Sequence, residues 1–178
     1  MRQISNCDQT AVFFDVSNDY TLAHKGQKNV WVRQGGHAKT RVTVMLAAFG
    51  DGTKMKPTIV FKHSAQDAAS SRIASEFTPA GRAKYGYPPA DKLECRVQKQ
   101  AWFGEGEMVH WVKHTLAKHR SPGPHILICD AFAGHKTQAV RESLQRSGVK
   151  LCMIPGGITS VVQVMDTHVN KVFKCHIR

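Results

Sequence analysis

Three aspartates stand at positions from which the expected fold could bring their carboxylates together. Asp8 ends an apolar-leaning stretch at residues 4–7, Asp130 follows the apolar run 126–129, and Asp166 lies near the start of the last expected helix. Converging carboxylates repel one another unless a cation neutralises them, and such hard oxygen ligands select Mg²⁺ or Mn²⁺ over zinc. Two such ions, about 4 Å apart, are the usual arrangement for in-line attack on a phosphodiester. The three acids therefore define a candidate metal-dependent nuclease site.

Each aspartate also has a purely structural explanation, which the sequence leaves open. Asp8 could start a turn, and Asp130 could be a loop or capping residue. An acid at Asp166, in a first helical turn, would be favoured by the helix dipole alone. Metal ligation is thus one of two explanations at each position until the three side chains are located.

Other polar and aromatic residues near these acids have two possible roles. His135 could contact substrate or support a metal ligand, or it could be a structural residue before a helix. Asn170 and Lys171 could support Asp166 or touch phosphate, and an exposed helix face explains them nearly as well. The tryptophans Trp102 and Trp111 are expected to be core residues rather than platforms for base stacking.

The elements that must position these residues follow an α/β order. A helix is possible over 65–77, and clearer helices are expected over 105–119, from a Thr137 cap to 146, and from 165 to the end. Strands are expected over 4–7, 30–32, 41–49, 58–62, 93–97, 126–129 and 150–154.

The order of these elements predicts a mixed sheet. Residues 41–49 and 58–62 flank an Asp51-Gly52 turn signal and form a natural antiparallel pair. The later strands, 126–129 and 150–154, look fully buried and are separated by a helix, which favours parallel pairing. The expected architecture is a single α/β domain with a mixed β-sheet flanked by helices.

The charge of the chain indicates a polyanionic partner. Twenty-five Lys and Arg oppose 13 Asp and Glu among 178 residues, which leaves a net charge of +12. Nucleic acid is the commonest polyanion, although a merely soluble basic surface is the plainer alternative. No membrane association is expected, because the longest apolar run, 44–49, is far too short to cross a bilayer.

The cysteines and paired histidines suggest no zinc site. Five cysteines lie far apart without a CxxC motif, which argues against a disulfide framework and for a reducing, intracellular compartment. Cys129 and Cys152 sit inside apolar runs and are expected in the core. His110 and His114 have the i, i+4 spacing of helical zinc ligands, but they lie off the apolar face and are expected on the solvated surface.

Four ordered blocks resemble the DDE superfamily endonuclease domain of the pogo/Tigger/jerky group of transposases. They are NCDQT at 6–10, RVTVMLAAFGDGTKMKPTIVFK at 41–62, ICDAFAGH at 128–135 and IPGGITSVVQVMDTHVNKVFK at 154–174. The resemblance implies an RNase H-like fold and a catalytic core that cleaves and transfers DNA strands with two Mg²⁺ (or Mn²⁺) ions. It also implies a DNA partner, possible homo-oligomers on DNA ends, and a nuclear location.

Carried over residue by residue, the resemblance makes Asp8, Asp130 and Asp166 the three catalytic metal ligands. Thirty-five residues lie between the second and third acids, a separation typical of the family. In the implied mechanism Asp8 bridges the two ions, while Asp130 and Asp166 each hold one. Water, and later a DNA 3′-hydroxyl, attacks the phosphorus without a covalent enzyme intermediate.

The sequence also departs from the family pattern. Relatives usually have proline where Ala11 and Val164 stand, and Val164 could alter how the last helix begins and where Asp166 points. Relatives carry helix-turn-helix domains before the core, so residues 1–178 are expected to be one catalytic core without them. The alternatives to an active nuclease are a domesticated or decayed non-catalytic DNA-binding or chromatin protein and, more remotely, an RNA-cleaving nuclease.

Overall fold

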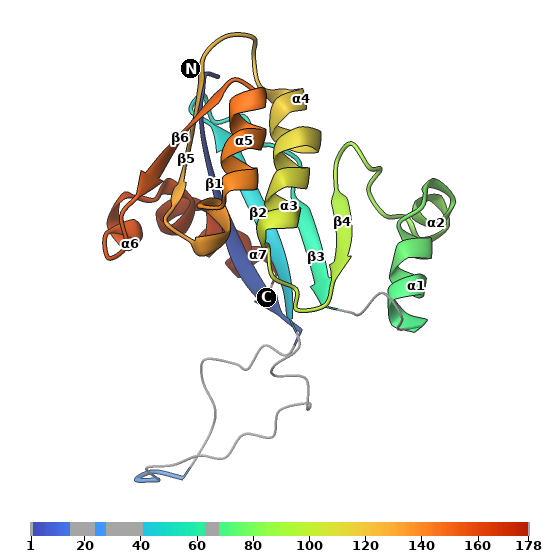
Figure 1. Ribbon diagram of the computed structural model, residues 1–178. Helices are drawn as coiled ribbons and strands as arrows, with labels where there is room; N and C mark the ends of the chain where they lie inside the picture. Colours follow the sequence, from blue (N-terminus) through green and yellow to red (C-terminus); the bar gives the residue numbers. More distant parts are fainter. Residues whose placement is uncertain (1, 15–23, 28–40, 63–67, 178) are drawn as a thin grey trace.

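The computed structural model describes residues 2–14, 24–27, 41–62 and 68–177. Within these segments, six strands form one sheet in the order β4-β3-β2-β1-β5-β6 (Figure 1). The strands are β1 (Ile4–Phe13), β2 (Arg41–Phe49), β3 (Thr58–Lys62), β4 (Glu94–Gln98), β5 (His125–Asp130) and β6 (Val149–Ile154). The expected strand at residues 30–32 lies outside the described residues.

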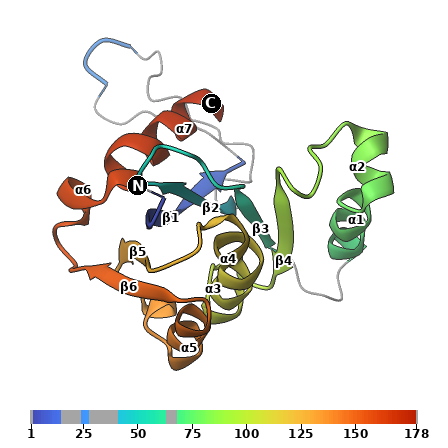
Figure 2. The same cartoon turned by 90° about the horizontal axis from the view of Figure 1, so that it is seen from above.

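Helices cover both faces of the sheet. On one face lie α3 (Glu105–Trp111), continued by the π-helical η1 (Val112–Leu116) and α4 (Ala117–His119), together with α5 (Gln138–Arg146). The opposite face carries α7 (Lys171–Ile177), while α1 (Ala68–Glu76) and α2 (Pro79–Tyr85) stand beyond the β4 edge (Figure 2). The remaining short elements are η2 (Ala133–His135), α6 (Thr159–Val162) and the π-helical η3 (Met165–Asn170).

The sheet is mixed, as predicted. Strand β2 pairs antiparallel with both β1 and β3, and β1–β5, β5–β6 and β3–β4 are parallel pairs. The prediction that the first strand ends at Asp8 is wrong, because β1 continues along β2 as far as the Phe13–Arg41 pair. Asp8 therefore lies in mid-strand opposite Leu46 of β2, two residues beyond the last residue of β1 that pairs with β5.

The core lies between the sheet and the α3–η1 helix. Trp111 and Met108 point from this helix onto the sheet and are fully buried, as the helical spacing predicted. Leu127 and Cys129 of β5 are also fully buried, whereas Ile126 of the same strand is exposed. The prediction of a fully buried strand is therefore wrong for β5: its side chains alternate between a covered face and a more open one.

The last strand and part of the C-terminal segment differ from the sequence expectations. β6 is an edge strand, and the expectation that Cys152 lies in the core is wrong because its side chain is exposed. The expected helix from residue 165 is present as η3 continued by α7, although its first part is π-helical; Met165 is buried and Val172 is exposed, and the short α6 precedes it. Thr137 does precede α5, but its side chain makes no capping hydrogen bond. Among the described residues, no helix has the length and apolar character needed to span a membrane.

Candidate active site

Asp8 and Asp130 come from neighbouring parallel strands at matching positions. Asn6 of β1 pairs with Ile128 of β5, and each aspartate lies two residues further along its strand. Because side chains two residues apart share one face of a sheet, the two carboxylates start from adjacent positions on the same face. Both residues line a pocket of about 280 Å³. The structure thus brings together the first two acids predicted from the sequence.

Asp166 reaches the same region through Asn170. The two residues lie one turn apart on η3, and the Asn170 amide Nδ2 is 3.3 Å from Asp166 Oδ1. The same Nδ2 is 2.6 Å from Asp8 Oδ2, and Asn170 is buried. Asp166 itself is exposed and lies outside the lining of the pocket that the other two acids share. Asp8 is therefore linked to both other acids: it shares the pocket with Asp130 and the Asn170 amide with Asp166.

The environment of Asp8 disfavours its charged form. Burial raises the pKa of Asp8 to about 7, and the hydrogen bond with Asp166 and the charge of that residue act in the same direction. The hydrogen bond from Asn170 opposes this shift in pKa. A carboxylate held in this state gains stability when a cation arrives, because the cation stabilises the ionised form.

His135 fixes the orientation of Asp130. Its Nδ1 lies 3.0 Å from Asp130 Oδ1 and 3.1 Å from the main-chain oxygen of the same residue. The imidazole is fully buried, and its Nε2 is 2.6 Å from the Gln9 side-chain amide. The hydrogen bond from His135 holds the pKa of Asp130 below its ordinary value. Burial opposes protonation of the imidazole, but hydrogen bonds to Asp130 and Cys129 raise the pKa of His135 to about 10.

The donor set suits a hard cation shared between carboxylates. Asp8 and Asp130 offer oxygen ligands at the pocket, and the buried Asn170 Oδ1 beside Asp8 has no hydrogen-bond partner in the described structure. Across the described segments, however, no group of three or more His, Cys, Asp or Glu side chains is already arranged to hold a metal ion. The residues therefore fit two ligand pairs joined at Asp8, rather than one closed cage around a single ion.

Sequence reasoning missed part of this site. Gln9 follows the first acid, and no pattern in the sequence indicates its contact with His135. The prediction that Trp102 is a core residue is wrong: its side chain is 49 % exposed and lines the pocket beside Asp8 and Asp130. Lys171 is exposed and, among the described residues, makes no hydrogen bond to any of the three acids.

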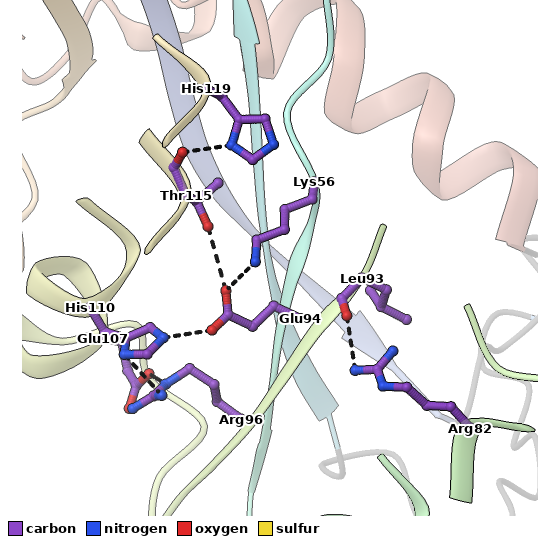
Figure 3. Close-up of polar contacts among 9 residues, drawn as sticks. All are labelled: Lys56, Arg82, Leu93, Glu94, Arg96, Glu107, His110, Thr115 and His119. Carbon is purple, nitrogen blue, oxygen red and sulfur yellow. Dashed lines mark hydrogen bonds and ion pairs between the residues drawn. The ribbon is translucent and has the colours of Figure 1, made fainter. Parts of the chain in front are cut away.

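His110 belongs to a different polar cluster, shown in Figure 3, and the ring of His114 stacks on that of His110 with centroids 4.2 Å apart. His110 Nε2 lies 2.6 Å from Glu94 Oε1, and the Arg96 guanidinium is 3.2 Å from His110 Nδ1. Because arginine only donates, Nδ1 of His110 accepts from Arg96, and Nε2 donates to the Glu94 carboxylate. Lys56 adds an ion pair to Glu94 at 3.3 Å. The surface expectation is thus correct for the exposed His114 and wrong for the half-buried His110, which links α3 to β4.

Similar proteins support the fold and the family. Mos1 transposase, in a paired-end complex with the left transposon end, superposes with a TM-score of 0.52 at 11 % identity, covering 99 % of this chain and 42 % of that one. A pre-cleavage Mos1 transpososome matches equally well, at 10 % identity and 43 % coverage of its chain. These likenesses show that the fold is RNase H-like, as predicted.

Sequence comparison gives the relationship directly. The human "Pogo transposable element with KRAB domain" is 28 % identical over 99 % of this chain, and its mouse counterpart is 27 % identical. This chain spans about a quarter of the length of those two relatives, 26 % in each case. The family model for the DDE superfamily endonuclease matches residues 39–178, well over half of the sequence. The chain belongs to the DDE superfamily endonuclease family, in its pogo group.

Proposed function

We propose that this domain cleaves DNA phosphodiester bonds and transfers DNA strands, with Asp8, Asp130 and Asp166 as the ligands of two Mg²⁺ or Mn²⁺ ions. The observation that carries the proposal is the central position of Asp8. It shares a pocket with Asp130 and is joined through the Asn170 amide to Asp166. A carboxylate that lies near both other acids is suited to bridge two cations.

The protein groups then have distinct roles. When bound, the two ions would stabilise the negative charge that develops on the phosphate and activate the attacking hydroxyl. Asp130 is held in one orientation by His135, and Asp8 by Asn170, so neither carboxylate must be ordered when the substrate arrives. Without a bound cation, the pKa of Asp8 is about 7, so part of the protein carries a proton on this carboxyl at neutral pH. Cation binding would release that proton.

Several observations support DNA as the substrate. The net charge of +12 favours a polyanion, and the structural relatives are transposase complexes, one of them with a transposon end. On the same grounds we propose that residues 1–178 form a single catalytic core, that copies associate on DNA ends, and that the protein acts in the nucleus.

Plasmid nicking in Mg²⁺ or Mn²⁺ tests the proposal. The wild-type domain is compared with Asp130→Ala and with Asp51→Ala, which removes an exposed turn acid far from the site. We expect nicking by the wild type and Asp51→Ala, and none by Asp130→Ala. Equal activity of all three proteins, or activity that survives EDTA, would exclude the proposed site. An RNA substrate of matched length, run in parallel, separates a DNA nuclease from an RNA nuclease.

A second candidate function is DNA binding without cleavage. Its support is the exposed position of Asp166, outside the pocket that Asp8 and Asp130 share. Calorimetric titration with Mn²⁺ distinguishes the two candidates, because a non-catalytic relative has no need of the metal. Tight binding that disappears in Asp8→Asn supports the nuclease, whereas DNA binding without any metal binding supports the second function.

A further inference from the structure

Trp102, in the loop between β4 and α3, is exposed although both of its neighbours are buried. Its exposed fraction is 49 %, against 0 % for Ala101 and 2 % for Phe103. Tryptophan buries more apolar area than most side chains when it enters a core. Here the flanking Ala101 and Phe103 are buried and anchor the loop, whereas the indole of Trp102 is exposed to solvent.

The backbone before Trp102 is held in an uncommon conformation. Ala101 has a φ of 52° and, among the described residues, is the one non-glycine with a positive φ. Thr43 Oγ1 donates to the Ala101 oxygen at 2.5 Å, and the Trp102 amide donates to Gln98 Oε1 at 3.1 Å. A strained conformation that several hydrogen bonds maintain is a feature that clusters at functional sites.

The indole forms a wall of the pocket that contains two of the proposed ligands. Asp8 and Asp130 line the same cavity, and Arg41 lines it as well. Phe132 contributes a second aromatic wall, with its ring centroid 6.0 Å from that of Trp102 and an angle of 43° between the planes. Aromatic faces, a guanidinium and the proposed metal ligands therefore meet in about 280 Å³.

This combination matches one nucleotide better than an apolar ligand. A nucleotide offers a flat base to an aromatic ring and a phosphate to a cation, whereas an apolar group would leave the carboxylates and Arg41 without partners. A base inside a duplex has both faces stacked on its neighbours, so only an unpaired or flipped base can lie on the indole.

We propose that Trp102 stacks on an unpaired nucleotide base, next to the phosphate that ions bound by Asp8 and Asp130 would hold. Arg41 contacts the DNA backbone. The inference rests on the proposed function, since it assumes that a phosphodiester lies at those two acids. It adds a substrate preference: DNA with an unpaired or easily unpaired base at the reacting position binds better than fully paired DNA.

Equilibrium binding of labelled oligonucleotides tests this preference in Ca²⁺, which occupies oxygen sites and supports cleavage poorly. Two DNAs of equal length are compared, one a full duplex and one with an unpaired 3′ tail. The proteins are the wild type, Trp102→Ala, Trp102→Phe, and Tyr85→Ala as a control that removes an exposed aromatic side chain from α2. Trp102→Ala is expected to weaken binding of the tailed DNA roughly 5- to 150-fold, the range of base stacking on an aromatic ring. Binding of the duplex should change less than about twofold, and both Trp102→Phe and Tyr85→Ala should retain the preference for the tail.

Photo-crosslinking of the wild type provides an arm that needs no variant. A tail containing 5-iodouracil is irradiated in the complex, and the crosslinked peptide is identified by mass spectrometry. A crosslink at Trp102 supports the inference, whereas crosslinks confined to other peptides overturn it. The inference is also overturned if Trp102→Ala weakens binding of tailed and paired DNA equally, or if it changes the affinity for tailed DNA by less than twofold.

Plasmid nicking separates this inference from the proposed function. Normal nicking without a Trp102-dependent preference for the tail refutes the stacking site alone. A different result is a wild type that prefers the tailed DNA although it neither nicks DNA nor binds Mn²⁺. That result refutes the nuclease function and the scissile phosphate assumed in the inference. It leaves Trp102 as part of a pocket that binds a base.

Discussion

The amide Nδ2 of Asn170 lies 2.6 Å from Asp8 Oδ2, although the two residues are 162 positions apart in the chain. The same atom is 3.3 Å from Asp166 Oδ1. One buried amide therefore connects a carboxylate in the middle of the sheet to one on a C-terminal helix. This contact makes Asn170 the residue that sets the distance between the first and third proposed ligands.

Asn170→Ala is expected to weaken Mn²⁺ binding by about 10- to 100-fold, the usual effect of losing a group that orients a metal ligand. The change also leaves Asp8 Oδ2 buried without its partner, which costs about 1–3 kcal/mol of folding free energy. Calorimetry measures the first effect and urea unfolding the second. The matched control is Lys171→Ala, at the next, exposed position. Equal Mn²⁺ affinities for the two variants would contradict the role given to Asn170.

His135→Ala is expected to affect both stability and metal binding. The buried imidazole contacts Asp130 and Gln9, so its removal takes one hydrogen-bond partner from each of these side chains and opens a cavity. We expect a loss of about 2–4 kcal/mol in unfolding free energy and a Mn²⁺ affinity lower by about tenfold or more. His114→Ala, which removes an exposed histidine, should change neither. If Mn²⁺ affinity stays constant while stability falls, His135 is a core residue and not a support for Asp130.

The metal-free domain should lose stability as pH rises from about 4 to 7. The pKa of Asp8 is raised from 3.8 to about 7, so over this interval the folded protein keeps a proton that the unfolded chain has released. The free energy of unfolding then decreases with pH, by at most about 1.4 kcal/mol per pH unit from this group. Urea unfolding in EDTA at several pH values measures the slope, which Asp8→Asn should remove.

Two further groups provide internal checks on that slope. The pKa of His135 is raised from 6.5 to about 10, so its contribution is complete below pH 6.5 and is lost as pH rises towards 10. Asp8→Asn should therefore lose the decline below pH 7 and leave the slope above it unchanged, where the pKa of Cys129, lowered to about 6, opposes the contribution of His135. Asp51→Asn should leave both unchanged, because the pKa of that exposed acid is lowered to about 2 by local hydrogen bonds. An unchanged slope below pH 7 in Asp8→Asn would refute the assignment.

The sequence predicted the mixed sheet and the place of Asp130 at the end of a strand, because those features are local. Apolar runs and turn signals in the sequence identify strands. An acid that directly follows an apolar run, such as Asp130, can be recognised from the sequence alone. The extent of β1 beyond Asp8 was not predictable, since it depends on pairing with β2, some 30 residues away in the chain. The exposure of Trp102 depends likewise on Thr43 holding the strained Ala101 backbone, a contact between distant segments. Hydrophobicity alone predicts an indole in the core.

Val164→Pro introduces the residue that the family resemblance implies at this position and should stabilise the domain. Val164 has a φ of −57°, close to the value that proline imposes, and the preceding Gln163 is extended with a ψ of 107°. Among the described residues, the Val164 amide donates no backbone hydrogen bond that proline would remove. The substitution therefore restricts the unfolded chain at little cost to the folded one, for a gain of about 0.4–1 kcal/mol.

Thermal unfolding measures this gain as a rise in Tm of about 1–4 °C. The matched control is Val162→Pro, two residues earlier and equally exposed, where the amide donates to the Ile158 oxygen at 3.0 Å. That hydrogen bond would be lost, so Val162→Pro should lower Tm. If Val164→Pro lowers Tm as well, the start of η3 is not preorganised for proline, and the departure from the family pattern at Val164 has changed the backbone that carries Asp166. A rise in Tm with unchanged Mn²⁺ affinity would mean that valine at this position costs stability without moving the third acid.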